Sequence, residues 1–467
     1  MNFEDAIAGG VEQYRRLNKS PIRIVAHLDS DGISACSILI KALKRERVNF
    51  VSSIVKQIDD NLLKELKSEP YKTIFFIDLG SGYLDEINEA LKKNIFILDH
   101  HKPERESNKN LDIIHLNPHL YGVDGNSEIS GAGIVYLFCK ALNEKNIDLA
   151  YLAVIGAIGD MQENKGFIGL NQKIVEDAVA SGKIEVKNGL RMFGMQTKPL
   201  YKVLEYSTDP YIPNVTGNEE GAKNFLEENG ITLKGENGKY KKLIHLNEED
   251  MKKLVTAIIL KRLGSEEKPE DVLGPIYLLT EEEEENPTKD AKEFSTLLNA
   301  CGRMNKPSYG IGTCLGNKRI KRLAGELLIE YKKEIINSLN WFYNNKSKVA
   351  EGKNYIIINA EDNIKDTLIG TLSSIISKSN VYREGTIIIG LAHTLDDDTK
   401  VSARIAGFKN GDSDLRKIMK AVVTKVGGFG GGHKSAAGAL IPQEKEIEFI
   451  DSLKLILDKE VIEESVQ

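Results

Sequence analysis

Short, uninterrupted apolar runs alternate with helix-like patterns through the first hundred residues, and this alternation constrains the fold more than any other feature of the chain. The runs cover residues 22–27, 49–55, 73–77 and 94–98, and apolar residues at helical spacing lie between them. Strands of this kind are buried on both faces, which is typical of a parallel sheet covered by helices on both sides. The sequence therefore predicts an α/β fold built on a parallel sheet.

Three of the predicted strands end on residues that can bind a metal ion. The first leads into His27, Asp29 and Asp31, the third into Asp78, and the fourth into Asp99-His100-His101. The carboxyl ends of parallel strands meet at one edge of a sheet, where open α/β folds bind ligands. Five of the eight histidines lie between residues 27 and 119, so imidazole is concentrated in the same region. Carboxylate and imidazole ligands together suit manganese, iron or zinc, and we predict a divalent metal site at this edge.

Each acidic position has a simpler interpretation when it is taken alone. Asp29 and Asp31 precede a helical pattern, and acidic residues there are typical of N-capping and of charge–dipole complementarity. Asp160 ends the small-residue apolar helix expected over residues 150–159, where an unpaired carboxylate is poorly solvated. An ordinary loop aspartate is the alternative for that position. The convergence of several strand ends, rather than any single residue, favours a metal site.

Length and composition bound the remaining possibilities. A chain of 467 residues is too long for one ordinary core, so two or three domains are expected. The chain has no apolar stretch long enough to span a membrane and does not begin with a signal-peptide pattern, and a cytoplasmic location is expected. The net charge of −6 argues against a uniformly basic surface for nucleic acid, but allows a local basic groove.

The texture of the chain suggests four segments. Residues 1–194 form the α/β domain already described, and residues 195–285 are an inserted α-rich subdomain that ends in an acidic run. Residues 286–350 return to the first domain and include a long, lysine-rich connecting helix over 320–342. Residues 351–467 form a smaller α/β domain with strands expected over 355–358, 386–392 and 400–405.

Several residues outside the first strands are candidates for binding phosphate. Arg303 follows Gly302, and such a turn can direct a guanidinium at a phosphate, although a surface arginine is an equal alternative. Ser402 and Arg404 fall on the same face of a predicted strand. The backbone amides of a glycine-rich segment that includes Gly431, Gly432 and His433 can cradle a phosphate, whereas a flexible hinge is the alternative.

These residues resemble the motifs of a known family. Asp29-Ser-Asp31-Gly32, Asp78, Asp99-His100-His101 and Asp160 are similar to the four motifs of the DHH phosphoesterases, and most similar to the archaeal RecJ-like exonucleases. Leu298-Asn299-Ala-Cys-Gly302-Arg303 resembles a motif of RecJ-type nucleases, and residues 427–435 resemble the Gly-Gly-Gly-His motif of the DHHA1-type domain. His27 departs from the aspartate that bacterial RecJ enzymes usually carry and resembles the manganese-dependent pyrophosphatases of the superfamily.

The resemblance implies a two-lobed protein with metal and substrate in the cleft between the lobes. Two Mn²⁺ ions, with Mg²⁺ as the alternative, would be held by His27, Asp29, Asp31, Asp78, His100 and Asp160, and Asp78 would bridge them. Asp99 would support a ligating histidine, and His101 would contact the scissile phosphate. The substrate would be bound by Asn299, Arg303, Ser402, Arg404, Gly431, Gly432 and His433.

The expected activity is that of a manganese-dependent exonuclease specific for single strands. It would release mononucleotides from single-stranded DNA, in the 5′-to-3′ direction, or from single-stranded RNA, and would serve DNA replication or repair. A phosphodiesterase for short oligoribonucleotides or cyclic dinucleotides is one alternative, and a catalytically silent replication scaffold is another. The resemblance also implies that the insert contacts the GINS complex.

Overall fold

The chain folds into two compact units, residues 1–328 and 329–467. The computed structural model describes residues 2–17, 21–103, 112–163, 166–207, 210–263, 268–379, 381–407, 413–432 and 434–464. The long helix α13 (Lys318–Asn344) contains the boundary between the units, and lies where a connecting helix was expected. In the part of the chain that is described, no helix is long and apolar enough to cross a membrane.

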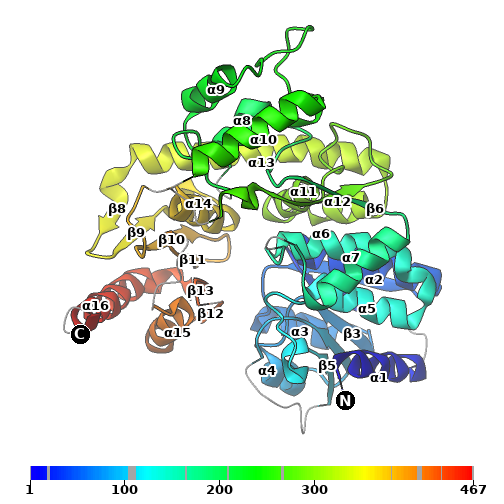
Figure 1. Cartoon of the computed structure of the whole chain (residues 1–467). Helices are drawn as coiled ribbons and strands as arrows, with labels where there is room; N and C mark the ends of the chain where they lie inside the picture. Colours follow the sequence, from blue (N-terminus) through cyan, green and yellow to red (C-terminus); the bar gives the residue numbers. More distant parts are fainter. Residues whose placement is uncertain are drawn as a thin grey trace. The chain divides into compact units, whose positions relative to one another are not determined.

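A five-stranded parallel sheet forms the centre of the first unit (Figure 1). Its order is β2-β1-β3-β4-β5, with β2 (Phe50–Val55), β1 (Ile22–His27), β3 (Thr73–Ile77), β4 (Asn94–Leu98) and β5 (Ile113–Leu116). Every pairing is parallel, and neighbouring strands end close together, because Ala26 pairs with Ile77 and Ile77 pairs with Leu98. The fold class predicted from the apolar runs is confirmed.

Helices cover both faces of this sheet. On one face Val25, Phe76 and Ile97 pack against α3 (Asp60–Ser68) and α4 (Leu84–Ala90). On the other face the Phe75 and Phe96 rings stack at 4.5 Å. That pair meets α1 (Phe3–Arg16) and α5 (Gly131–Leu142) through the rings of Tyr14 and Phe138. Alternate residues of each strand therefore face opposite layers, which explains why the strands read as continuous apolar runs.

Three further helices of the first unit pack against α2 (Ser30–Arg45), namely α6 (Ala150–Gly159), α11 (Ala291–Arg303) and α12 (Pro307–Cys314), and α7 (Gly169–Ala180) packs against α6. Helix α2 begins three residues before the first apolar residue of its pattern, because Asp29 caps it by accepting a hydrogen bond from the Gly32 amide at 3.0 Å. Asp31 therefore lies in the first helical turn rather than in a loop.

The insert is a small helical subdomain closed by a two-stranded ribbon. Strands β6 (Ile184–Leu190) and β7 (Leu273–Leu279) pair antiparallel at its base, a ribbon that the sequence did not suggest. Between them α8 (Leu200–Glu205), α9 (Glu219–Glu228) and α10 (Glu248–Arg262) share a separate apolar core that includes Leu204, Phe225 and Ile258. The helical composition of this segment agrees with its sequence pattern.

The second unit is a mixed six-stranded sheet with helices. The strand order is β12-β13-β11-β10-β9-β8, formed by β8 (Val349–Glu351), β9 (Tyr355–Asn359), β10 (Ile387–His393), β11 (Asp398–Ile405), β12 (Phe429–Gly432) and β13 (Ala436–Pro442). Helix α14 (Asp366–Lys378) packs on β10 and β11, and α15 (Leu415–Val426) and α16 (Glu446–Glu464) pack on the main apolar core. Residues Phe429–Gly432 of the glycine-rich segment form strand β12 at the edge of this sheet, a strand that the sequence did not predict.

Candidate metal centre

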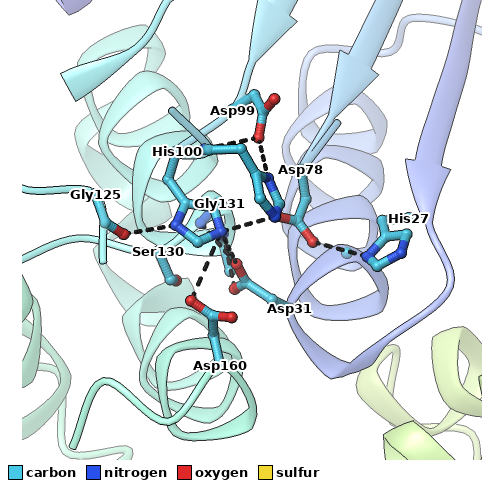
Figure 2. A network of polar contacts seen from close by, with 12 residues as sticks. His27, Asp31, Asp78, Asp99, His100, Gly125, Ser130, Gly131 and Asp160 are labelled. Carbon is cyan, nitrogen blue, oxygen red and sulfur yellow. Dashed lines mark hydrogen bonds and ion pairs between the residues drawn. The ribbon is translucent and has the colours of Figure 1, made fainter. Parts of the chain in front are cut away.

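The predicted ligands come together at the carboxyl edge of the parallel sheet. His27 ends β1, Asp78 follows β3, Asp99-His100-His101 follows β4, and Asp160 caps the end of α6. The centre thus draws on residues as far apart in the sequence as His27 and Asp160, which are 133 positions apart. Figure 2 shows Asp78 between the His27 and His100 rings, with Asp31 and Asp160 beside His100.

Asp78 occupies the middle of the cluster. Its Oδ2 lies 3.5 Å from His27 Nδ1, and its Oδ1 lies 3.3 Å from His100 Nε2. Its backbone has a φ of +58°, a left-handed conformation that residues other than glycine seldom adopt. Strained conformations of this kind gather at functional sites, where the surrounding structure maintains them. Here the turn places a carboxylate that is 1 % exposed between two imidazoles.

Four ligand-type atoms around Asp78 lack hydrogen bonds. Both Asp78 oxygens, His27 Nδ1 and His100 Nε2 are buried without a hydrogen-bond partner, although His27 Nδ1 lies 3.0 Å from Asp29 Oδ2. The distances suit ion pairs, but the angles do not suit hydrogen bonds. Leaving such atoms unsatisfied costs about 1–3 kcal/mol each. A divalent cation would satisfy all four atoms at once, so the donor set fits the metal ions that the sequence predicted.

His100 is held in the orientation of a metal ligand. Its Nδ1 lies 2.6 Å from the carbonyl oxygen of Gly125. Because a carbonyl oxygen only accepts hydrogen bonds, Nδ1 carries a proton, and Nε2 is the nitrogen that would offer a lone pair to a cation when the ring is neutral. Nε2 lies 3.3 Å from Asp78, 3.6 Å from Asp160 and 3.9 Å from Asp31. A backbone carbonyl that fixes one ring nitrogen while the other faces carboxylates is typical of metal-binding histidines.

Asp31 joins two helix N-termini. It lies in the first turn of α2, and its carboxylate accepts hydrogen bonds from the Gly131 amide at 2.7 Å and the Ala132 amide at 3.0 Å, at the start of α5. Two helix dipoles therefore favour negative charge at this position. The capping interpretation was thus correct for this acidic pair, and it coexists with a position beside the cluster.

Sequence reasoning missed two glycines that make room for the carboxylates. A Cβ atom at Gly131 would lie 2.6 Å from Asp78 Oδ1, and one at Gly156 would lie 2.4 Å from Asp31 Oδ1. No ordinary Cβ contact is so short, so any other residue would displace a carboxylate. The only signal in the sequence is the small-residue texture of Gly131-Ala-Gly133 and of α6.

Gln162 was also missed, although it connects two of the candidate ligands. Its Nε2 donates to Asp160 Oδ2 at 2.8 Å and to the Gly125 carbonyl at 2.8 Å, the same carbonyl that fixes His100. Its Oε1 accepts a hydrogen bond from Asn171 at 2.7 Å. Gln162 and Asn171 therefore orient Asp160 and His100 together. Glutamine and asparagine at loop positions have no periodic signature, so the sequence alone gives no reason to select them.

His101 faces the same cluster through a different set of contacts. One ring nitrogen of His101 lies within 4.8 Å of ligand atoms of Asp78 and His100, and His27, Asp29 and Asp78 form a second group with the same spacing. Its Nδ1 lies 2.7 Å from Asp99 Oδ1. Asp99 is buried, as expected for a residue that supports a histidine rather than meeting the substrate.

The charged groups of the metal-free centre have shifted pKa values. Burial opposes charge on the His27 and His100 rings, but the neighbouring carboxylates outweigh it and raise both pKa values well above 6.5. Burial and repulsion from Asp78 raise the pKa of Asp31 well above 3.8. Each of these groups binds its proton more tightly in the folded state than in the unfolded state.

We therefore expect the metal-free protein to lose stability as the pH rises. For groups with a raised pKa, the added stability is present at low pH and is lost as the pH passes through the folded-state value. In EDTA, the Tm should fall as the pH rises above about 6.5, the ordinary pKa of an unfolded-state histidine. With saturating Mn²⁺ the fall should disappear, because the cation replaces the protons. Calorimetric scans with and without Mn²⁺ measure both slopes, and identical slopes would contradict a metal centre at these groups.

Asn299 and Gly302 hold the β1–α2 connection in place. Asn299 Oδ1 accepts a hydrogen bond from the Ser30 amide at 2.9 Å, so its side chain orients the start of α2. A Cβ atom at Gly302 would lie 1.7 Å from the Leu28 carbonyl oxygen, so only glycine allows this approach. Arg303 is the last residue of α11 and is half-buried beside this contact.

The other candidate phosphate contacts belong to the second unit. The Arg404 guanidinium donates to Ser402 Oγ at 3.2 Å and to the Ala403 carbonyl at 2.8 Å, so these two side chains share one face of β11 as predicted. Gly431 and Gly432 are exposed in strand β12. His433 lies outside the described residues.

Comparison with known proteins agrees with this geometry. Family models match the chain over three segments: the DHH family N-terminal domain over residues 21–157, the DHH-CID domain over 192–273 and the DHHA1 domain over 352–459. An uncharacterized protein of Methanocaldococcus jannaschii is 34% identical over 450 residues, which is 94% of each chain. A Bacillus subtilis prophage protein, whose name proposes a single-strand DNA-specific exonuclease, is 29% identical over 133 residues, 27% of this chain and 22% of its own.

Solved structures share the fold at low sequence identity. Cdc45 from Entamoeba histolytica superposes with a TM-score of 0.63 at 14% identity, over 97% of both chains. RecJ from Thermus thermophilus in complex with Mn²⁺ superposes with a TM-score of 0.59 at 16% identity, over 98% of this chain. This chain spans 55% of the length of that RecJ.

The family models and the fold place the chain in the phosphoesterase class, and the acidic edge of its sheet is a candidate divalent metal centre. The chain belongs to the DHH family, and its fold is that of the RecJ-like members. The resemblance stated from the sequence motifs is confirmed.

Proposed function

We propose that the protein is a metal-dependent phosphodiesterase that degrades single-stranded nucleic acid from an end. The observation that carries this proposal is the group of four buried, unsatisfied ligand atoms around Asp78. Membership of the DHH family supports it, as do the name of the Bacillus subtilis relative and the Mn²⁺ of the Thermus RecJ structure.

The proposed ligands divide between the two sides of Asp78. Two Mn²⁺ ions, or Mg²⁺ in their place, would be held by His27, Asp29, Asp31, Asp78, His100 and Asp160. Bound there, divalent cations would activate water for attack and offset negative charge on the phosphoryl oxygens. Asp78 is the proposed bridging ligand, because its two oxygens face His27 and His100 separately.

His101 is the proposed contact to the scissile phosphate. Asp99 accepts a hydrogen bond from its Nδ1, and its Nε2 would meet a phosphate oxygen or donate a proton. Burial opposes charge on this ring, but the Asp99 carboxylate raises its pKa, which favours the protonated form. For the rest of the substrate we propose contacts from Asn299, Arg303, Ser402, Arg404, Gly431, Gly432 and His433.

The finer assignments follow the resemblance. We propose 5′-to-3′ release of mononucleotides from DNA, with RNA as a second substrate, in replication or repair in the cytoplasm. The helical insert of residues 195–285 is the proposed contact to the GINS complex. A phosphodiesterase for short oligoribonucleotides or cyclic dinucleotides would use the same centre.

A catalytically silent scaffold is the second candidate. The fold similarity to Cdc45 favours it as much as the similarity to RecJ favours an enzyme, because a shared fold does not require a shared activity. The six proposed metal ligands favour the enzyme, since all of them are present and lie in one cluster.

The test is hydrolysis of matched DNA and RNA strands, each labelled at the 5′ or the 3′ end, in Mn²⁺ or in EDTA. We expect manganese-dependent release of mononucleotides from the 5′ end of single-stranded DNA. Activity restricted to dinucleotides and very short oligomers would replace the polymer substrate with a short one. No hydrolysis of any strand in Mn²⁺ would contradict the enzyme and support the scaffold.

A further inference from the structure

Three contacts fix His101, of which two come from Asp99 in the Asp99-His100-His101 motif and one comes from Asn117, outside the family motifs named above. The Asp99 carboxylate oxygen Oδ1 lies 2.7 Å from the ring Nδ1 and accepts the His101 backbone amide at 3.2 Å. The His101 carbonyl oxygen accepts a hydrogen bond from Asn117 Nδ2 at 2.8 Å. Asn117 is completely buried just after β5. The ring and both backbone groups of His101 are therefore held at once.

A second layer supports these contacts. The Ser81 amide donates to Asp99 Oδ2 at 2.9 Å, and Ser81 Oγ lies 2.8 Å from Asn117 Nδ2 and 2.9 Å from His115 Nε2. An amide nitrogen only donates, so Ser81 Oγ accepts from Asn117, and Ser81 Oγ also shares a hydrogen bond with His115 whose donor depends on the imidazole tautomer. Burial lowers the pKa of His115 to about 4, so the ring is neutral. We call Ser81, Asp99, His115 and Asn117 the His101 clamp.

The His101 clamp is separate from the contacts that orient His100. His100 is oriented by the Gly125 carbonyl, which also accepts a hydrogen bond from Gln162. Ser81 and Asn117 instead bond Asp99, the His101 carbonyl and each other. Buried polar networks are costly unless they are fully paired, and a paired network specifies one geometry. Two networks therefore fix the two adjacent histidines independently.

We propose that Asn117, Ser81 and His115 are positioning residues that act on the reaction through the His101 ring. The proposal rests on the proposed function, in which His101 contacts the scissile phosphate. It predicts that damage to the His101 clamp lowers turnover and leaves metal binding intact. Substitution of Gln162 should instead weaken metal binding, because Gln162 contacts Asp160 directly.

The test combines kinetics with metal titration. Asn117→Ala should lower kcat about 10- to 100-fold, as loss of a supporting hydrogen bond does in metal enzymes. The KM and the Mn²⁺ affinity should stay within about twofold of wild type. Ser81→Ala is the milder second variant, because it removes one oxygen and keeps the backbone contact to Asp99. The matched control is Asn146→Ala, a completely buried asparagine that bonds the Cys139 carbonyl at the opposite end of α5 and should affect stability alone.

A double-mutant cycle identifies the route of the effect. If Asn117 acts through the His101 ring, Asn117→Ala should have no further effect on kcat in a His101→Ala background. An equal loss of kcat in both backgrounds, or a parallel loss of Mn²⁺ affinity, would overturn the proposal. If the wild type hydrolyses the substrate and the clamp variants have the same kcat, this inference alone is refuted. If the wild type hydrolyses no substrate, the proposed function is refuted together with it.

Discussion

Asp78→Ala is expected to abolish hydrolysis while the protein remains folded. Among the described residues, Asp78 alone has carboxylate oxygens that face both His27 and His100, so its loss would leave each ring without its shared partner. We expect kcat to fall at least about 10³-fold, which corresponds to about 4 kcal/mol in the activation free energy. The metal-free variant should be as stable as the wild type, because the substitution removes two unsatisfied buried oxygens and repulsion with Asp31.

Asp177→Ala is the matched control for this variant. The Asp177 carboxylate bonds Tyr136 and Lys140 at 2.8 Å, so its loss should lower stability and leave turnover unchanged. Steady-state kinetics and thermal scans of both variants measure the two effects separately. Wild-type turnover by Asp78→Ala would refute a metal centre built on this residue.

Gly131→Ala is expected to cause the second large effect, although it adds a single methyl group. The new Cβ would lie 2.6 Å from Asp78 Oδ1, so the carboxylate or the start of α5 must move. A glycine-to-alanine change within a helix otherwise stabilises a protein by about 0.4–1 kcal/mol. We expect hydrolysis to fall about 100-fold and the Mn²⁺ dissociation constant to rise, since ligand geometry governs both.

Gly9→Ala in α1 provides the comparison, because a Cβ atom there meets nothing within 4 Å. That variant should retain full activity and be slightly more stable. If Gly131→Ala had the same activity as Gly9→Ala, the tight packing at Asp78 would have no functional role.

The strand ends could be predicted from the sequence because a simple physical rule connects them. Apolar runs such as residues 73–77 must be strands buried on both faces, and parallel pairing brings Asp78 and His100 to one edge. The start of α2 could not be predicted as well. The apolar pattern of this helix starts at Ile33, but capping by Asp29 makes the helix begin at Ser30 and include Asp31. The rule therefore predicts the position of a side chain where the local sequence pattern and the sheet topology together determine it.

The supporting residues could not be predicted because their roles depend on tertiary contacts. Gln162 and Asn117 are single polar residues in irregular segments, and their partners lie up to 62 positions away. Gly131 matters only because α5 packs against the Asp78 carboxylate. The glycines of β12 had the same composition as a phosphate loop, but pairing with β13 made them an edge strand.

The most direct test of the account is calorimetric titration of the metal-free wild-type protein with Mn²⁺. The account predicts specific binding of two ions per chain with proton release, weaker binding by Gly131→Ala, and loss of the bridged pair in Asp78→Ala. The same weak, non-stoichiometric binding by wild type and Asp78→Ala would contradict it, because the buried carboxylates and imidazoles around Asp78 would then have no metal to hold.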